Sequence, residues 1–184
     1  RFGMARETGE ILNQALNKGR EKKKGLGESI AQLIHESDFP YKNVSVLASA
    51  YAHGIPVTVH VAIGTDIIHF HPDARGDVLG ELSLRDFFIL CGMIEKLNGG
   101  GVFINAGSAV LLPEVFLKAI TYVRNRGIPL NDFSTAVFDF IRHYRPSENV
   151  VKRPVAGGTG KGYYFIGHHE IMLPLVAAAL KSLD

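Results

Sequence analysis

Histidines and an aspartate that could bind a metal ion or a substrate gather in one segment, Ile63-Gly-Thr-Asp-Ile-Ile-His-Phe-His-Pro72. The segment contains Asp66, His69 and His71, and His60 precedes it. An H-x-H pair beside a carboxylate offers the nitrogen and oxygen ligands that zinc and other transition metals use. One hypothesis is therefore a metal-dependent hydrolase that uses these four residues. The alternative is that the same side chains line a small-molecule pocket through hydrogen bonds.

A second polar segment, Asn105-Ala-Gly-Ser-Ala109, contains a glycine where a predicted strand meets a predicted helix. Gly107 lets the backbone approach a ligand closely, and free amides at the beginning of a helix favour a phosphate group. The sequence is not a full G-x-G-x-x-G fingerprint. A plain tight turn is therefore the alternative to a phosphate site.

The glycine-rich segment Gly157-Gly-Thr-Gly-Lys-Gly162 is not a P-loop. It has Val155 where a P-loop needs glycine, ends in glycine instead of serine or threonine, and precedes a predicted strand instead of following one. Its lysine, Lys161, and the upstream Lys152 are candidate nucleophiles. Two solvated lysines are the alternative.

Two adjacent histidines stand before the last predicted helix, in Gly167-His168-His169-Glu170. A glutamate such as Glu170 is favourable in the first turn of a helix and has a structural explanation there. The histidines are candidates to face a ligand, because imidazole is the side chain best suited to proton transfer near neutral pH.

The pattern around these segments predicts helices that alternate with strands. Predicted helices cover residues 1–40 and begin near Val44, Ser83, Pro113 and Glu170. Predicted strands lie at residues 55–63, 102–105, 133–138 and 163–166. Ser83 and Asp86 have the spacing of a capping box and set the expected beginning of their helix. The alternation predicts a three-layer α/β fold, in which a mainly parallel sheet has helices on both faces and binds ligands beyond the carboxyl ends of its strands.

Length and composition indicate a globular protein. We expect the 184 residues to form a single domain, in which residues 41–184 are the core after the helical segment. A net charge of +2 gives no bulk electrostatic reason to expect nucleic acid as a partner. No apolar run reaches the roughly 18 residues of a membrane span, and the single cysteine, Cys91, cannot form an internal disulfide, so we expect a cytoplasmic protein without a membrane partner. The helical sequence without an initiator methionine suggests that an N-terminal part of a longer chain is missing.

Over residues 27–183 the order of the segments resembles that of the deoxyhypusine synthase family. The matching segments are Tyr51–Pro72, Val102–Ala119, Arg145–Glu148 and Leu173–Ala177. In the first segment Gly64-Thr-Asp66 and His71 are similar to that family's substrate loop, and the second segment lies where the family has its dinucleotide-binding glycine turn. The resemblance implies a Rossmann-like fold that binds NAD.

The resemblance also implies an activity and site residues. In that family NAD oxidises an amine, and a lysine of the enzyme captures the resulting imine. Residue by residue, the resemblance matches Asp66 to an acidic substrate-binding position, Gly107 and Ser108 to the glycine turn, and His168 to a cofactor-binding position. Together with the candidates described above, the predicted sets are Lys152, Lys161, His168 and His169 for catalysis; Asn105, Gly107, Ser108, His168 and Glu170 for the cofactor; and Gly64, Thr65, Asp66 and His71 for the substrate. These assignments imply an NAD-dependent transferase or oxidoreductase that assembles as a homo-oligomer.

The sequence departs from the family at positions that matter for its reaction. Pro113 and its neighbours replace a Lys-His-His stretch and remove a polyamine-binding histidine, and neither Lys152 nor Lys161 has the family's spacing after Arg145-Pro. We therefore expect action on a small amine or amino-acid-like substrate and not deoxyhypusine synthesis itself. A non-catalytic binding or assembly module is a third hypothesis.

Overall fold

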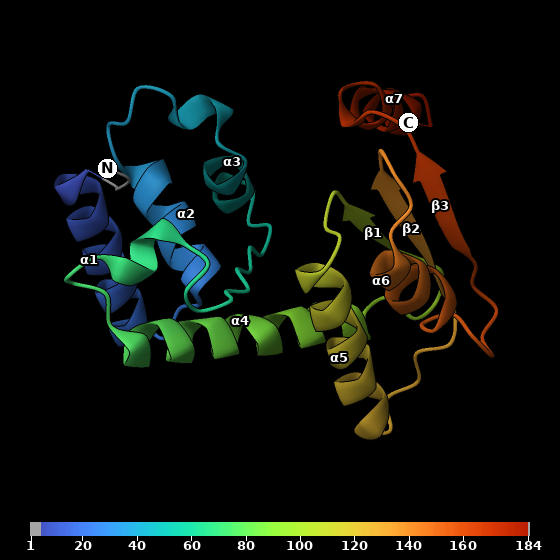
Figure 1. Ribbon diagram of the computed structural model, residues 1–184. Helices are drawn as coiled ribbons and strands as arrows, with labels where there is room; N and C mark the ends of the chain where they lie inside the picture. The colour runs from blue at the N-terminus through green and yellow to red at the C-terminus, as the bar shows by residue number, and fades with distance from the viewer. Residues whose placement is uncertain (1–4, 184) are drawn as a thin grey trace. The chain divides into compact units, whose positions relative to one another are not determined.

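The computed structural model describes residues 5–183, which divide into two compact units. The first unit ends at Leu90 and the second begins at Cys91, so the boundary falls inside helix α4 (Gly76–Glu95). Figure 1 shows that the first unit is built from helices and that the second contains the sheet. A single Rossmann-like domain over residues 1–184 stays a prediction.

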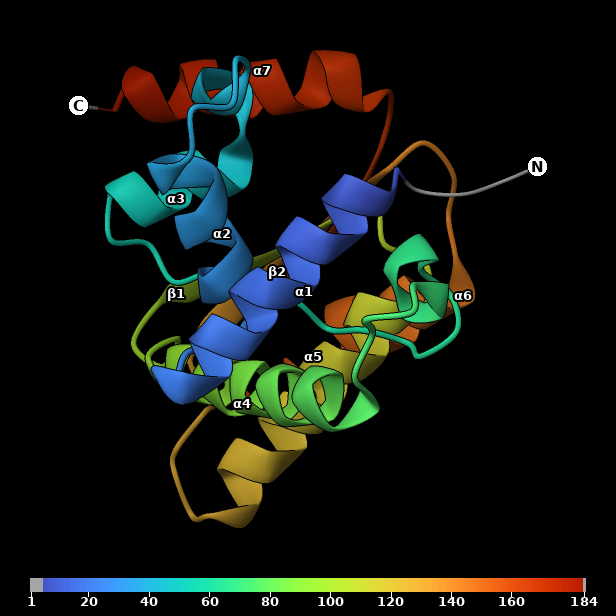
Figure 2. The same cartoon turned by 90° about the vertical axis from the view of Figure 1, so that its left-hand side faces the viewer.

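The first unit consists of helices around a small apolar core. Its elements are α1 (Arg6–Glu21), α2 (Leu26–Glu36), the short turns η1 (Lys42–Val44) and η2 (Ile67–Phe70), α3 (Val46–Ala52) and the first part of α4. Figure 2 shows α1 and α2 side by side. Leu16 of α1 and Leu26 of α2 are buried together with Val78, Leu79 and Leu82 of α4. α1 and α2 lie within the segment predicted to be helical, whose first four residues are outside the described part of the chain.

The strand predicted at residues 55–63 is not formed. This segment pairs with no strand in the part of the chain that the structure describes. Val59 and Val61 instead direct their backbone amides at α4, where Asp86 Oδ2 accepts one at 2.8 Å and Ser83 Oγ accepts the other at 3.5 Å. The prediction is wrong because β-branched residues do not by themselves supply the neighbouring backbone that makes a strand.

Helix α4 begins at Gly76 and not at Ser83, so the predicted capping box is wrong. Asp86 is fully buried, and its Oδ2 accepts hydrogen bonds from the amides of Gly27 and Val59, each at 2.8 Å. Gly27 lies in the first turn of α2, whose amides have no partner within their own helix. Asp86 therefore caps α2 from a distant helix and holds the irregular segment in place.

The second unit contains a sheet of three parallel strands in the order β1-β2-β3. Its elements are β1 (Gly101–Ala106), α5 (Leu111–Asn125), β2 (Phe133–Asp139), α6 (Tyr144–Pro146), the π-helical turn η3 (Ser147–Lys152), β3 (Gly162–Ile166) and α7 (His169–Lys181). The strands predicted at 102–105, 133–138 and 163–166 and the helices predicted near Pro113 and Glu170 are confirmed. The chain is therefore an α/β protein with a small parallel sheet.

Elements α5 and η3 cover one face of this sheet. The ring of Phe103 in β1 stacks on Phe116 of α5 with 3.5 Å between centroids, and Thr135 of β2 donates its hydroxyl to the carbonyl of Val150 in η3 at 2.7 Å. The other face presents exposed apolar side chains, which belong to Val102, Ile104, Tyr163 and Phe165. Helices on both faces of the sheet stay a prediction.

Alternate glycines of the segment 157–162 lie directly against backbone carbonyls. A Cβ atom at Gly160 would lie 1.6 Å from the carbonyl oxygen of Phe133 at the beginning of β2, and Gly158 and Gly162 meet other carbonyls in the same way. This glycine-rich segment therefore has a packing role. No helix within residues 5–183 is long and apolar enough to cross a membrane.

Candidate functional site

The carboxyl ends of the three strands meet at one edge of the sheet in the second unit. β1 ends at Ala106, β2 at Asp139 and β3 at Ile166, and Figure 1 shows α7 beyond the heads of the strand arrows. In parallel sheets the loops at this edge hold the ligand. This edge is therefore the candidate functional site.

A left-handed glycine turn joins β1 to α5. Gly107 has φ +69°, and its amide donates to the carbonyl of Phe138 at 3.0 Å. Ser108 Oγ accepts the amide of Leu112 at 3.2 Å, while Asn105 Nδ2 donates to the carbonyl of Ser108 at 3.0 Å. The structure thus brings together three predicted cofactor residues in one turn with a defined shape.

The first residue of α7 packs over this turn. A Cβ atom at Gly107 would lie 3.2 Å from Nε2 of His169, so a glycine gives the imidazole the room that it occupies. His168 precedes α7 and is exposed, as is Glu170 in the first turn of the helix. The loops after β1 and β3 therefore meet, as the sequence predicts for residues at the carboxyl edge.

Two polar atoms at this edge are buried without a hydrogen-bond partner among the described residues. They are Oδ1 of Asn105, whose side chain is 3% exposed, and Nδ1 of His169. A buried polar atom without a partner costs about 1–3 kcal/mol, so each such atom calls for an explanation. A bound ligand with complementary groups would supply the missing hydrogen bonds.

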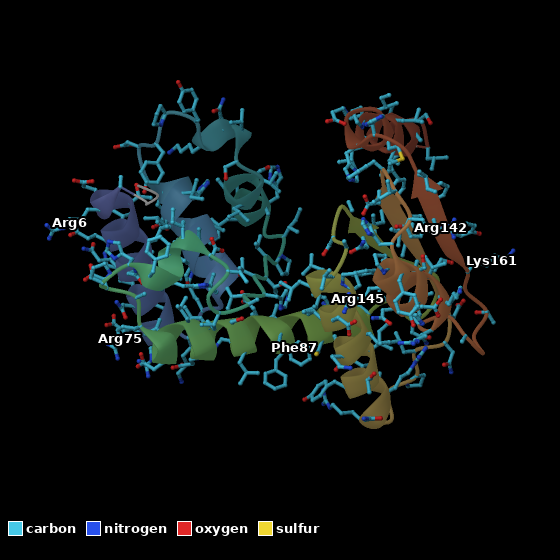
Figure 3. All side chains as sticks on the ribbon, viewed as in Figure 1. Arg6, Arg75, Phe87, Arg142, Arg145 and Lys161 are labelled. Carbon is cyan, nitrogen blue, oxygen red and sulfur yellow. The ribbon has the colours of Figure 1, made fainter. Side chains whose placement is uncertain are left out.

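The two predicted lysines lie at the opposite end of the strands. Lys152 follows Val151, whose carbonyl lies against Gly162 at the beginning of β3, and Lys161 immediately precedes that strand (Figure 3). Both are exposed, and Lys152 Nζ donates to Glu148 Oε1 at 2.6 Å. The structure does not bring the lysines together with the histidines at the carboxyl edge.

In the first unit, the predicted substrate loop uses its polar atoms to hold its own backbone. Nδ1 of His69 accepts the amides of Gly64 at 3.0 Å and of Asp66 at 3.2 Å, and Asp66 accepts the amide of Ile67 at 3.1 Å. The hydroxyl of Thr65 donates to a backbone carbonyl at 2.7 Å. These bonds form a reciprocal cap at the beginning of η2.

His71 packs against helix α1. A Cβ atom at Gly9 of α1 would lie 2.2 Å from Cδ2 of His71, and the side chain of His71 is only 10% exposed. Its ring borders a cavity of about 430 Å³, which Arg6, Phe70 and Asp73 also line. His71 is therefore packed against α1, and its Nδ1 accepts the amide of Asp73 at 3.2 Å.

The structure does not assemble the predicted metal site. Within residues 5–183 no three side chains of His, Cys, Asp or Glu could hold a metal ion. His69 Nδ1 and the carboxylate of Asp66 are used in the cap, His69 Nε2 is buried without a hydrogen-bond partner among the described residues, and His71 packs on α1. Nε2 of His60 forms a hydrogen bond with Oγ1 of Thr58 at 3.1 Å, and burial lowers the pKa of His60. These contacts contradict the hypothesis that the four residues together bind a metal ion.

Sequence reasoning missed Asp139, which ends β2 at the candidate site. Its side chain is 2% exposed; Oδ1 accepts the amide of Phe140 at 2.8 Å, and Oδ2 lies 3.8 Å from Nε2 of His143. The signal was present, because an aspartate directly follows the strand predicted at 133–138. An acidic residue at the carboxyl end of a parallel strand is a candidate ligand group by position alone.

The residues predicted to bind the cofactor thus belong to the second unit, and those predicted to bind the substrate belong to the first. Comparisons with models of protein families, with curated proteins and with solved structures find no match to this chain.

Proposed function

We propose that the chain binds NAD or a related nucleotide at the carboxyl edge of its sheet and acts on a small amine or amino-acid-like substrate. The observation that carries this proposal is the left-handed turn at Gly107, which lies between β1 and α5 and beside the unpartnered atoms of Asn105 and His169. The sequence resemblance to the deoxyhypusine synthase family supports the same ligand.

The turn after β1 lies at the beginning of a helix, where a phosphate of a nucleotide is expected to bind. A 15-residue helix, α5, begins at Leu111, three residues after Ser108, and the positive end of its dipole favours an anion at the turn. Gly107 has no side chain and His169 packs where one would lie, so a pyrophosphate would approach the backbone of the turn beside this imidazole. His169 lies at the same turn, where an imidazole N–H would donate to a phosphate oxygen.

The proposed chemistry assigns proton transfer to the histidines at this edge. His168 is exposed and adjoins the turn through His169, so either imidazole could take a proton from a bound substrate. NAD would supply the acceptor for hydride when bound. The substrate roles of Gly64, Thr65, Asp66 and His71 and the homo-oligomeric state rest on the family resemblance.

A second candidate is a nucleotide-binding module without lysine chemistry. The observation that favours it is the position of Lys152 and Lys161, which are exposed and lie at the amino end of β3. A lysine nucleophile needs to touch the substrate. If Lys152→Ala and Lys161→Ala leave a measured turnover unchanged, lysine capture is not part of the reaction.

Substitution of Gly107 tests the proposed function. We expect Gly107→Ala to weaken NAD binding about 10-fold or more, because its Cβ meets His169 and narrows the phosphate turn, and a loss of about 1.4 kcal/mol corresponds to that factor. Gly127→Ala is the matched control: Gly127 also has positive φ, +77°, but follows the other end of α5. Isothermal titration calorimetry measures both affinities. Equal weakening by the two substitutions, or no heat with folded wild-type protein, would contradict the proposal.

A further inference from the structure

We propose that the first unit binds an α-amino acid with an apolar side chain, in a cavity formed by α2, α3, α4 and the segment that follows α3. Figure 2 shows α2 and α3 side by side. The cavity has a volume of about 350 Å³ and is lined by aliphatic residues, Tyr51 and Glu28. It lies within the first unit, so the inference goes beyond the proposed function and does not depend on nucleotide binding in the second unit.

The first argument is a pair of opposite charges at the cavity. Lys24 Nζ donates to Glu28 Oε1 at 2.6 Å and lies 5.4 Å from the centroid of the Tyr51 ring, and both of these neighbours line the cavity. The hydrogen bond with Glu28 raises the pKa of Lys24, so the ammonium stays charged at neutral pH. An α-amino acid carries the complementary charges, because its carboxylate accepts from an ammonium and its own ammonium donates to a carboxylate.

The second argument is the bonding capacity that this ion pair leaves for a ligand. The side chain of Glu28 is 42% exposed, and Lys24 binds one of its two carboxylate oxygens. The bond to Oε1 uses one of the three N–H donors of Lys24. A zwitterion can therefore bind both groups without breaking the pair. A simple amine would place its charge beside Lys24, and a simple carboxylate would place its charge beside Glu28.

The third argument is the apolar lining of the rest of the cavity. Ala31 of α2 is buried and Ile89 of α4 is half-buried, while Ile55 and Pro56 after α3 are exposed. Ile55 is 59% exposed although it lines a concave site. An isobutyl or benzyl group of a ligand would remove these apolar surfaces from water, which is favourable. The lining therefore selects an apolar amino acid over a small polar one.

Backbone contacts hold the wall of the cavity in place. Gly54 has φ +66°, and the amide of Ile55 donates to the carbonyl of Ala50 at 2.9 Å, so the chain reverses its direction at the end of α3. Val57 then lies against α2, because a Cβ atom at Gly27 would be 2.4 Å from the carbonyl oxygen of Val57. The site is therefore formed before a ligand binds, which lowers the entropy cost of binding.

Leucine and three compounds that each lack one of its groups test the inference on the wild-type chain. Isoamylamine lacks the carboxylate, isocaproate lacks the ammonium, and glycine lacks the apolar side chain. We expect leucine to bind about 10-fold more tightly than each of them, or by a larger factor, since one hydrogen bond to a charged group or one buried aliphatic side chain contributes about that much.

An NMR titration of ¹⁵N-labelled protein measures the four affinities and locates the site. The largest changes in amide chemical shift are expected at Ala31 and Val57, which line the cavity. No binding of leucine at millimolar concentration, the largest changes outside the first unit, or an affinity for any of the three other compounds that equals that for leucine overturns the inference.

Two substitutions assign the charged groups of the ligand to their partners. In Lys24→Met the ratio of leucine to isoamylamine affinity should fall from about 10 or more to about 2 or less, and in Glu28→Gln the ratio of leucine to isocaproate affinity should fall likewise. Lys96→Met is the control, because Lys96 is exposed and follows the end of α4; both ratios should keep their wild-type values. Unchanged ratios in the first two variants overturn the inference. Leucine binding without NAD binding would refute only the proposed function, and NAD binding without leucine binding would refute only this inference.

Discussion

The substitution Asp86→Ala is expected to lower the free energy of unfolding by about 3–5 kcal/mol, because it leaves the buried amide of Gly27 and the half-buried amide of Val59 without an acceptor. Oδ2 of Asp86 is the acceptor for Gly27 in the first turn of α2 and for Val59 in the irregular segment, each at 2.8 Å. Each unpartnered donor costs about 1–3 kcal/mol, and the truncation also leaves a cavity in a fully buried place. This one substitution would thus remove a hydrogen-bond acceptor from both the first turn of α2 and the segment 55–63.

Urea denaturation followed by far-ultraviolet circular dichroism measures this effect. Asp38→Ala, at an exposed position in the same unit, is the control and should change the free energy of unfolding by less than about 0.5 kcal/mol. Asp86→Asn retains one acceptor oxygen and should be less destabilising than Asp86→Ala. If the three variants are equally stable, Asp86 does not hold α2 and residues 55–63.

Asp86 is also expected to make the stability of the protein depend on pH in the acid range. Burial raises the pKa of Asp86 above its ordinary value, although the amides of Gly27 and Val59 oppose the shift. A carboxyl whose pKa is raised by folding stabilises the protein fully below its unfolded pKa of about 3.8, and this contribution is lost as pH rises through the folded pKa. Relative to Asp86→Asn, the wild type should therefore lose stability with rising pH over that range. Asp77 has the opposite effect on the pH dependence of stability, because the hydrogen bond from Arg75 lowers its pKa to about 2. Since Asp77 is present in both proteins, its contribution cancels when the wild type is compared with Asp86→Asn.

The second large effect is expected for Gly160→Ala, which should destabilise the protein by about 3 kcal/mol or more. The new Cβ would lie 1.6 Å from the carbonyl oxygen and 2.4 Å from the carbonyl carbon of Phe133. Phe133 is buried and begins the central strand β2, so the clash cannot be relieved without moving the sheet. The glycine-rich segment would then be required for packing and not for binding phosphate.

Gly80→Ala is the control for this substitution. Gly80 lies inside α4, and among the described residues no atom outside its chain neighbours and the backbone of its own helix would lie within 4 Å of its Cβ. Because alanine has a higher helix propensity than glycine, this variant should gain up to about 1 kcal/mol. Destabilisation of similar size in both variants would show that the contact with Phe133 is not the cause.

The strands of the second unit were predictable because each is a short run of apolar and β-branched residues next to turn residues. Residues 133–138 are mostly apolar or β-branched, and β2 is buried along most of its length as the central strand. The strand predicted at 55–63 has a similar composition but lacks a partner. Strand pairing is a long-range event, and the acceptors on α4 that replace it, at Asp86 and Ser83, could not be identified from local pattern.

The candidate site was predictable to the extent that it follows strand ends. Asn105, Gly107, Ser108 and His169 come together because β1 and β3 are parallel and their loops leave the same edge. The two lysines were grouped with these residues by family resemblance, although both precede β3 and lie at the amino end of the strand. Asp139 was not predicted, because a single aspartate at the end of a strand has no motif or spacing that distinguishes it in the sequence.

The most direct test of nucleotide binding at the carboxyl edge is an NMR titration of ¹⁵N-labelled protein with NAD. We expect the largest changes in amide chemical shift at Gly107, Ser108 and His169, and little change for the amide of Lys161 at the other end of β3. No shift changes at millimolar NAD, or the largest changes at Lys161 and its neighbours, would contradict nucleotide binding at the carboxyl edge.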